Sequence, residues 1–165
     1  MIILGIDPGV ATTGYGVIKT EGNNKWSAID YGCILTSSKT VFSKRLSKIF
    51  NELKILIKKY KPEKIVVEKI YFAKNVKTAF QVGEARGVIV LTADLNDVPV
   101  CELTPLQVKQ ALTGYGQASK QQIQKMVKLV LKLKEIPRPD DAADALAIAI
   151  AGAQIHPVRS SSIDY

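Results

Sequence analysis

The sequence predicts an α/β fold in which helices cover both faces of a mixed five-stranded sheet. Short β-branched runs joined by turn residues open the chain, which indicates hairpins and antiparallel pairing. Helical patterns then alternate with two later strands, which indicates crossover connections and parallel pairing. The length of 165 residues suits one domain. We expect residues 1–155 to form this domain and residues 156–165 to be a flexible tail.

The first three strands are predicted within residues 2–36. Residues 2–6 are a short apolar run, and the turn residues Asp7, Pro8 and Gly9 end it. Residues 14–19 and 26–36 are the second and third predicted strands, and a hairpin turn over residues 21–24 joins them. Short turns between successive strands predict an antiparallel meander.

The middle of the chain alternates helix and strand. Apolar residues recur at helical spacing over residues 43–60, and residues 64–68 form an apolar strand that ends in Glu68. A helix is predicted over residues 78–95 and a short strand over residues 98–103. Gly83 and Gly87 would let another backbone approach that helix, either from the chain's own sheet or from a second copy.

Three helices are predicted in the last third. Thr104 is placed to cap the first, with Pro105 at its first position. Ser119 and Gln122 have the spacing of a capping box at the start of a basic helix over residues 119–133. The final helix, residues 140–154, is apolar on nearly all sides and is predicted to be mostly buried.

The composition predicts a globular protein, and taken alone it slightly favours solvated lysines over a polyanionic partner. Hydrophobic residues make up 47% and charged residues 23%, which excludes disorder as the dominant state. The net charge of +8 comes from residues 39–77 and 109–138, which carry +9 and +6. Clustered positive charge is typical of nucleic-acid binding, although lysine-rich helices are also often merely solvated. Without a signal-peptide pattern or a cysteine framework, we expect a cytoplasmic protein.

Four carboxylates stand out because apolar sequence surrounds them. Asp7 and Glu68 end the first and fourth predicted strands, and Asp141 and Asp144 lie three residues apart on the final helix. Taken singly, Asp7 could serve the turn that follows it, and Asp141 could complement the helix dipole. Together, at one edge of an open α/β sheet, four carboxylates would require protonation or cations. All-oxygen ligands favour Mg²⁺ or Mn²⁺, and a pair of such ions suits displacement at phosphorus.

These residues lie in stretches that resemble the RuvC family of bacterial Holliday junction resolvases. The resemblance covers residues 1 to about 155 and rests on the stretches MIILGIDPGVATTGYGVI, VVEKIYFAKNVKTAFQVGEARG, TPLQVKQALTGYGQASKQQIQKMV and DDAADALAIAI. It implies a ribonuclease-H-like fold. It also implies a homodimeric endodeoxyribonuclease that resolves four-way DNA junctions by symmetric paired nicks in recombination and repair. The products would carry 5′-phosphate and 3′-hydroxyl ends.

The resemblance also assigns roles to single residues. It implies that two Mg²⁺ ions per subunit, for which Mn²⁺ can substitute, are held by the catalytic acids Asp7, Glu68, Asp141 and Asp144. Lys109 and Lys120 match the family's functional lysines, which implies catalytic contacts to DNA phosphate. Asp140 is an additional acid directly before the matching pair, and the Asp-Ala-Ala-Asp-Ala-Leu spacing favours Asp141 over it. The family's RuvA–RuvB branch-migration complex is an implied partner.

An aromatic pair follows the second acid. Tyr71 and Phe72 stand between Lys69 and Lys74, and the alternative to exposure is that they fill core beneath a loop. Tyr71 matches an aromatic position of the family, and an exposed ring can stack on an unpaired base. We expect Tyr71, Phe72 and Lys74 to contact DNA. His156, the single histidine, is given no role.

Other functions remain open from the sequence. A ribonuclease-H-like nuclease that acts on structured RNA would share the first strand and turn. A junction-binding module without catalysis would share the basic segments, although phosphate binding alone is better served without four acids. An actin-like or sugar-kinase ATPase opens with a similar turn but requires two domains, which 165 residues cannot house.

Overall fold

The computed structural model describes residues 1–22, 25–70 and 76–155, with side chains left out for residues 76–78. Its sheet contains the strands β1 (Ile2–Asp7), β2 (Thr12–Thr20), β3 (Trp26–Leu35), β4 (Lys64–Glu68) and β5 (Val100–Leu103). Its helices are α1 (Phe42–Tyr60), α2 (Val76–Asp94), α3 (Pro105–Thr113), α4 (Lys120–Val130) and α5 (Asp140–Gln154).

The predicted mixed sheet is confirmed. The strand order is β3-β2-β1-β4-β5, with β1 antiparallel to β2 and parallel to β4, and β4 parallel to β5. The three parallel strands therefore end at the same edge of the sheet. This edge receives Asp7 from β1 and Glu68 from β4, and α3 begins directly after β5.

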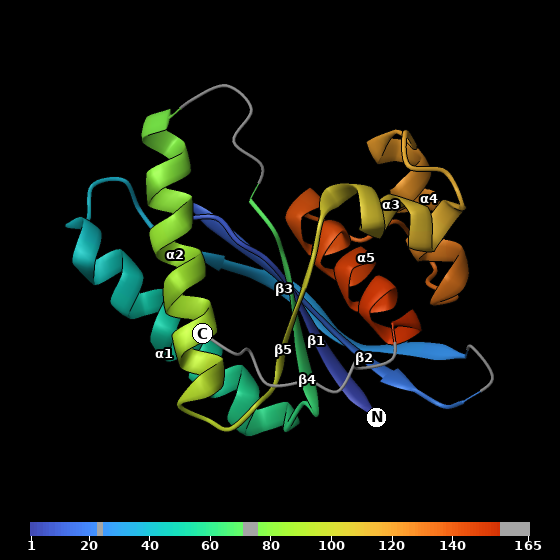
Figure 1. Ribbon diagram of the computed structural model, residues 1–165, viewed down its shortest axis with the longest axis horizontal. Helices are drawn as coiled ribbons and strands as arrows, with labels where there is room; N and C mark the ends of the chain where they lie inside the picture. The colour runs from blue at the N-terminus through green and yellow to red at the C-terminus, as the bar shows by residue number, and fades with distance from the viewer. Residues whose placement is uncertain (23–24, 71–75, 156–165) are drawn as a thin grey trace, which may run out of the picture.

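Helices cover both faces of the sheet, as predicted. Figure 1 shows α1 and α2 on one side and α3, α4 and α5 on the other. Each side has its own hydrophobic core. One core joins buried residues such as Ile49, Leu53 and Ile89 to the sheet, and the other joins Leu112, Val127 and Leu146 to it.

The predicted burial of the last helix is confirmed, and its closeness to the sheet depends on glycine. Gly5 pairs with Gly16 across β1 and β2, and Gly14 pairs with Asp7. A Cβ added at Gly5 would overlap the carbonyl oxygen of Ala145, and one at Gly14 would overlap that of Asp141. These strands thus offer bare backbone on which α5 rests.

Several predicted element ends shift because backbone hydrogen bonds decide them. The strand predicted from residue 98 begins at Val100, since the Val98 amide donates to the Ala93 carbonyl in the turn after α2. The basic helix predicted to residue 133 ends at Val130, and Lys132 adopts positive φ just beyond it. Both predicted helix starts with side-chain caps are confirmed, and each is a complete capping box.

The glycines of α2 do not pack against the sheet. A Cβ added at Gly83 or Gly87 would meet nothing within 4 Å in the part of the chain that the structure describes. Of the two predicted reasons for these glycines, approach to the chain's own sheet is therefore wrong. Among the described residues, no helix is long and apolar enough to cross a membrane.

Candidate functional site

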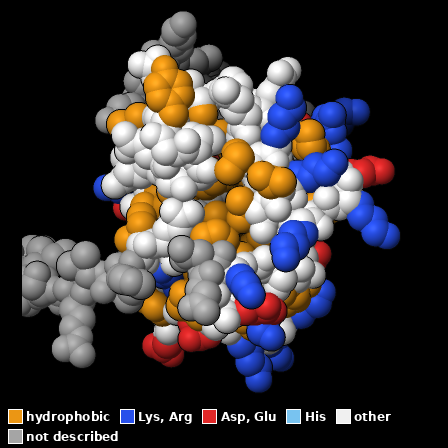
Figure 2. Space-filling view, turned by 90° about the vertical axis from the view of Figure 1, so that its right-hand side faces the viewer, with side chains coloured by type: hydrophobic (Ala, Val, Ile, Leu, Met, Phe, Trp, Pro, Cys, Tyr) orange, Lys and Arg blue, Asp and Glu red, His pale blue; other side chains and the backbone are white. Residues whose placement is uncertain are grey.

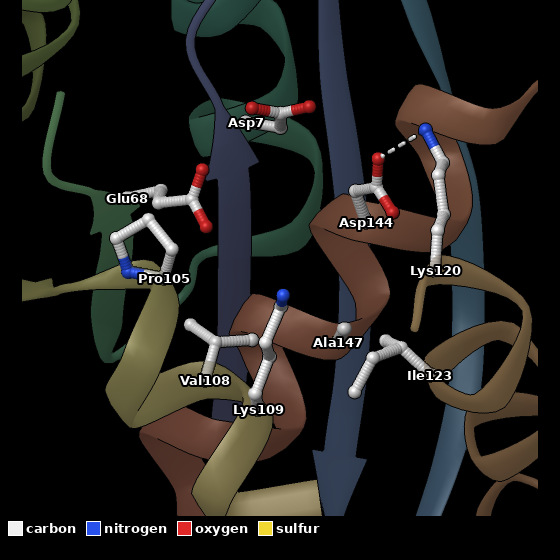
Figure 3. Close-up of a pocket in the computed structure, with 9 residues that line it drawn as sticks. All are labelled: Asp7, Glu68, Pro105, Val108, Lys109, Lys120, Ile123, Asp144 and Ala147. Carbon is white, nitrogen blue, oxygen red and sulfur yellow. Dashed lines mark ion pairs between the residues drawn. The ribbon is translucent and has the colours of Figure 1, made fainter. Parts of the chain in front are cut away.

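Three of the predicted acids surround one cavity at the carboxyl edge of the parallel strands. The cavity has a volume of about 200 Å³ and is lined by Asp7, Glu68, Pro105, Val108, Lys109, Lys120, Ile123, Asp144 and Ala147. Figure 3 shows Asp7, Glu68 and Asp144 around one space, with the Lys109 amine pointing toward it and the Asp144 carboxylate turned to the Lys120 amine. Residues far apart in the sequence thus meet at one point.

The fold explains why these acids meet. β1 and β4 are parallel neighbours, so the residues that end them, Asp7 and Glu68, lie side by side. Gly14, the register partner of Asp7, admits the backbone of Asp141 at the start of α5. The first turns of α5 therefore bring their carboxylates to the strand ends.

Burial and mutual repulsion oppose ionisation of these carboxyls. Burial, followed by the charges of Glu68, Asp144 and Asp141, raises the pKa of Asp7 from 3.8 to about 7. Burial and the Asp144 charge raise the pKa of Glu68, which Lys109 partly offsets. Burial also raises the pKa of Asp144 against the opposing effect of Lys120. Such a cluster of perturbed carboxyls at a cavity is typical of a functional site.

The two predicted lysines reach the cavity from α3 and α4. Lys120 Nζ lies 2.9 Å from Asp144 Oδ2 and 3.6 Å from Asp140 Oδ2. The hydrogen bond to Asp144 raises the pKa of Lys120, so this amine stays protonated. Lys109 lines the cavity on the side of Glu68, whose pKa its charge lowers.

The structure separates Asp140 from Asp141. Asp140 faces outward, where it pairs with Lys120 and lies 3.4 Å from Arg138, and 45% of its side chain is exposed. Asp141 lies close enough to Asp7 to raise its pKa, and it lines a neighbouring cavity rather than the first one. The position of Asp141 thus agrees with the sequence preference, while Asp140 lies on the rim.

The donor set fits a hard divalent cation. Asp7, Glu68, Asp141 and Asp144 offer only carboxylate oxygens, the ligand type that Mg²⁺ and Mn²⁺ prefer. The raised pKa values of Asp7, Glu68 and Asp144 indicate a local excess of negative charge that a cation would relieve. Within the described residues, no three His, Cys, Asp or Glu side chains converge closely enough to hold an ion as they stand. A bound ion would therefore have to draw the acids together and compete with Lys120 for Asp144.

The second basic segment, residues 109–138, forms an exposed face next to this cavity. Figure 2 shows lysine and arginine side chains gathered along one half of the surface that includes α3 and α4. On α4 and just beyond it, Lys125, Lys128 and Lys132 line a shallow groove with Leu129 and Leu133. This face is a solvated surface that a polyanion could contact.

Some of the predicted residues cannot be placed. Tyr71, Phe72 and Lys74, predicted to contact DNA, lie outside the described residues, and so does His156. Conversely, the sequence prediction missed Gly14, which admits the start of α5 to the site. A glycine within a strand is a signal of close backbone approach, which could have identified Gly14.

Comparisons with known proteins agree with this arrangement. The family described as crossover junction endodeoxyribonuclease RuvC matches residues 3–152. A protein of that name from Caldicellulosiruptor saccharolyticus is 52% identical over 165 residues, which cover 100% of this chain and 97% of the relative. The namesake from Petrotoga mobilis is 56% identical over 149 residues, covering 90% and 91% of the two chains.

Solved structures give the same result. The Thermus thermophilus RuvC structure superimposes with a TM-score of 0.87 at 37% identity, covering 93% of each chain. The structure of T. thermophilus RuvC in complex with a Holliday junction substrate superimposes with a TM-score of 0.86 at 35% identity, and the match again covers 93% of each chain. The yeast mitochondrial Holliday junction resolvase Ydc2 shares the fold, with a TM-score of 0.65 at 14% identity. The chain belongs to the RuvC family of crossover junction endodeoxyribonucleases.

Proposed function

We propose that this protein is a Mg²⁺-dependent endonuclease that resolves four-way DNA junctions by symmetric paired nicks. One observation carries the proposal: three carboxylates and two lysines from separate elements line a single cavity in a chain of the RuvC family. Nucleases of this family are metal-dependent. The junction as substrate is supported by the 35% identical Thermus thermophilus RuvC, which was solved with a Holliday junction.

In this proposal Asp7, Glu68, Asp141 and Asp144 are catalytic and hold two ions, Mg²⁺ or alternatively Mn²⁺. Bound there, the ions would stabilise charge on the attacking and leaving oxygens of the cut phosphodiester. The residues of the chain have separate tasks. Asp7 and Glu68 are fixed by β1 and β4, whereas Asp141 and Asp144 depend on the docking of α5. The nick would leave 5′-phosphate and 3′-hydroxyl ends.

Lys109 and Lys120 bind the DNA phosphates beside the cut. Their support is their position on the wall of the cavity, where the ammonium groups face the acids. When a cation occupies the acids, Lys120 is released from Asp144 and can turn to phosphate. We extend the DNA contact to Tyr71, Phe72 and Lys74 by family resemblance alone.

The protein works as a homodimer, because two like strands must be cut at symmetric points. The support is a stripe on α2. Phe80 and Leu91 of α2 and Leu95 just after it are 71%, 54% and 62% exposed, and Gly83 and Gly87 lie between Phe80 and Leu91 at helical spacing. Exposed apolar side chains next to bare backbone suit helix packing against a second copy.

The cellular setting follows from the substrate. An enzyme of DNA recombination and repair in bacteria acts where the chromosome is, so we place this one in the cytoplasm. Residues 1–155 would form the nuclease domain and residues 156–165 its tail. The RuvA–RuvB branch-migration complex is proposed as a partner by family resemblance.

The proposal can be tested with a panel of labelled substrates. The purified protein is mixed with a four-way junction, a linear duplex of the same sequence and a structured RNA, each with Mg²⁺ and with EDTA. We expect paired, symmetric, ligatable nicks in the junction only, and only with Mg²⁺. Cleavage of RNA alone would favour the RNA nuclease, and junction binding without cleavage at any metal concentration would favour the non-catalytic module.

A further inference from the structure

A second cavity lies beside the acid cluster. It has a volume of about 370 Å³ and is lined by Gly9, Val10, Ala11, Thr12, Arg45, Gln81, Val82 and Asp141. It shares no lining residue with the first cavity. The linings are nevertheless close in sequence. Asp7 lines the first cavity and Gly9 the second, and Asp144 lines the first and Asp141 the second. The acid cluster thus contributes Asp7, Glu68 and Asp144 to the first cavity and Asp141 to the second.

Arg45 is the one basic side chain among the described residues that line this second cavity. Its Nε donates to Thr36 Oγ1 at 2.8 Å, and the Thr36 hydroxyl donates to the Val10 carbonyl at 2.5 Å. These bonds tie the guanidinium to the turn between β1 and β2. In the described part of the chain Arg45 makes no ion pair. The N–H groups of its two Nη atoms can therefore donate to an anionic acceptor.

The local electrostatics favour an anion near Arg45. The residue lies at the start of α1, whose first turn holds no acid. The positive end of the helix dipole destabilises the charge of Arg45. An anion bound beside Arg45 would be stabilised by both the dipole and the guanidinium. Asp141 on the same wall would repel that anion unless its own charge were neutralised by a cation at the acid cluster. Anion binding in this cavity should therefore depend on divalent metal.

We propose that Arg45 binds a phosphodiester of the cut strand close to the scissile phosphate, through its two Nη groups. This inference rests on the proposed function and deepens it. Lys109 and Lys120 would hold the strand in the first cavity and Arg45 in the second, so the strand crosses the acids between two fixed points. The planar fork of arginine suits two oxygens of one phosphate, and Thr36 fixes its orientation. Arg45 is thus a positioning residue for the strand.

A chemical double-mutant cycle tests this contact. Junctions carry one uncharged methylphosphonate at successive positions around the cut, and binding is measured by titration with Ca²⁺ in place of Mg²⁺. Arg45→Ala is compared with the wild type. The matched control is Lys48→Ala, which removes an exposed charge on the next turn of α1.

We expect one methylphosphonate position at which the wild type loses about 10-fold to 100-fold in affinity, the range for hydrogen bonds to charged groups. Arg45→Ala should lose a similar factor on unmodified DNA and nothing further at that position. Lys48→Ala should keep the wild-type response at every position. Thr36→Val removes the hydroxyl that orients the guanidinium but leaves Arg45 in place. It should weaken junction binding less than Arg45→Ala does and keep the methylphosphonate response at the same position.

The inference would be overturned if the affinity loss from Arg45→Ala and the loss from the methylphosphonate simply added at every position. Arg45 would then act only by holding the β1–β2 turn. Thermal melting of Arg45→Ala separates that case, because a purely structural role lowers stability without changing the methylphosphonate pattern. If the wild type bound and cut the unmodified junction while the cycle showed no coupling, only the Arg45 contact would fail. If the wild type neither bound nor cut that junction, the proposed function would fail with it.

Discussion

At the scale of single residues, Asp7 lies where its own ionisation is opposed. Burial and three neighbouring carboxylates raise its pKa to about 7, against 3.8 in an ordinary environment. Between these two pH values the folded protein holds a proton that the unfolded chain has lost. The metal-free protein therefore loses stability as the pH rises from about 4 to about 7, and the loss is complete above that range.

We predict that Asp7→Asn raises the free energy of unfolding of the metal-free protein at pH 8. The gain over the wild type should be about 2–4 kcal/mol larger at pH 8 than at pH 5, because each tenfold shift in proton affinity corresponds to about 1.4 kcal/mol. Urea unfolding in EDTA at both pH values measures it. Asp94→Asn, an exposed acid at the end of α2, is the control. An Asp7→Asn protein less stable than the wild type at pH 8 would contradict this electrostatic interpretation.

Lys120 forms an ion pair with Asp144, one of the carboxylates that a metal ion would need. Its Nζ lies 2.9 Å from Asp144, so the ammonium and the ion compete for the same oxygens. We predict that Lys120→Ala tightens Mn²⁺ binding several-fold, measured by calorimetry, yet lowers junction cleavage by about 10-fold or more because the phosphate loses a charged donor.

The comparison for this prediction is Lys125→Ala on the same helix, where the lysine is exposed and makes no ion pair with a described acid. It should leave Mn²⁺ binding unchanged. Weaker Mn²⁺ binding by Lys120→Ala would mean that the amine organises the acids rather than competes for one of them.

At the scale of elements, the site depends on how closely α5 approaches the sheet. The backbone of α5 lies so close to Gly5 and Gly14 that neither position has room for a Cβ. We predict that Gly5→Ala lowers the free energy of unfolding by about 1–3 kcal/mol, the usual effect of overpacking. Gly14→Ala should instead lower cleavage more than stability, because it displaces the turn that carries Asp141.

Urea unfolding and junction cleavage of the two variants, measured side by side, separate these effects. Equal losses in both measurements for both variants would show that α5 moves as a rigid unit and that the position of the glycine along it does not matter.

The predictability of the elements follows from what decides their ends. The last helix could be predicted from residue 140 to residue 154 because Pro139 precedes it and an unbroken apolar run fills it. The start of β5 could not, because the Val98 amide is taken by the Ala93 carbonyl, a bond that only the folded turn defines. Side-chain caps at Thr104 and Ser119 act locally, so the sequence predicts both helix starts.

The site was predictable to the extent that its residues contrast with their sequence surroundings. Asp7 and Glu68 are acids that end apolar strands, and parallel pairing makes them neighbours. The choice between Asp140 and Asp141 needs the face that α5 turns to the sheet, which tertiary packing fixes. The proposed role of Arg45 depends on its bond to Thr36 across a loop, and no periodicity of the sequence encodes that contact.

At the scale of the whole molecule, symmetric cleavage requires two copies. We predict that Leu91→Glu, in the exposed stripe of α2, converts a dimer to a monomer in sedimentation equilibrium, because a buried charge opposes apolar packing. The same change at Leu129 of α4, which is 71% exposed, should leave the dimer intact. A dimer that persists in Leu91→Glu would place the subunit interface on another surface.

The most direct test of the four-acid centre measures binding and cleavage together in Asp7→Asn. Both this variant and the wild type are titrated with Mn²⁺ and with a labelled four-way junction, and cleavage is followed in Mg²⁺. We predict that Asp7→Asn binds the junction with nearly wild-type affinity, takes up fewer Mn²⁺ ions per chain than the wild type, and makes no paired nicks. Cleavage at the wild-type rate by Asp7→Asn would contradict the claim that Asp7 belongs to the catalytic centre.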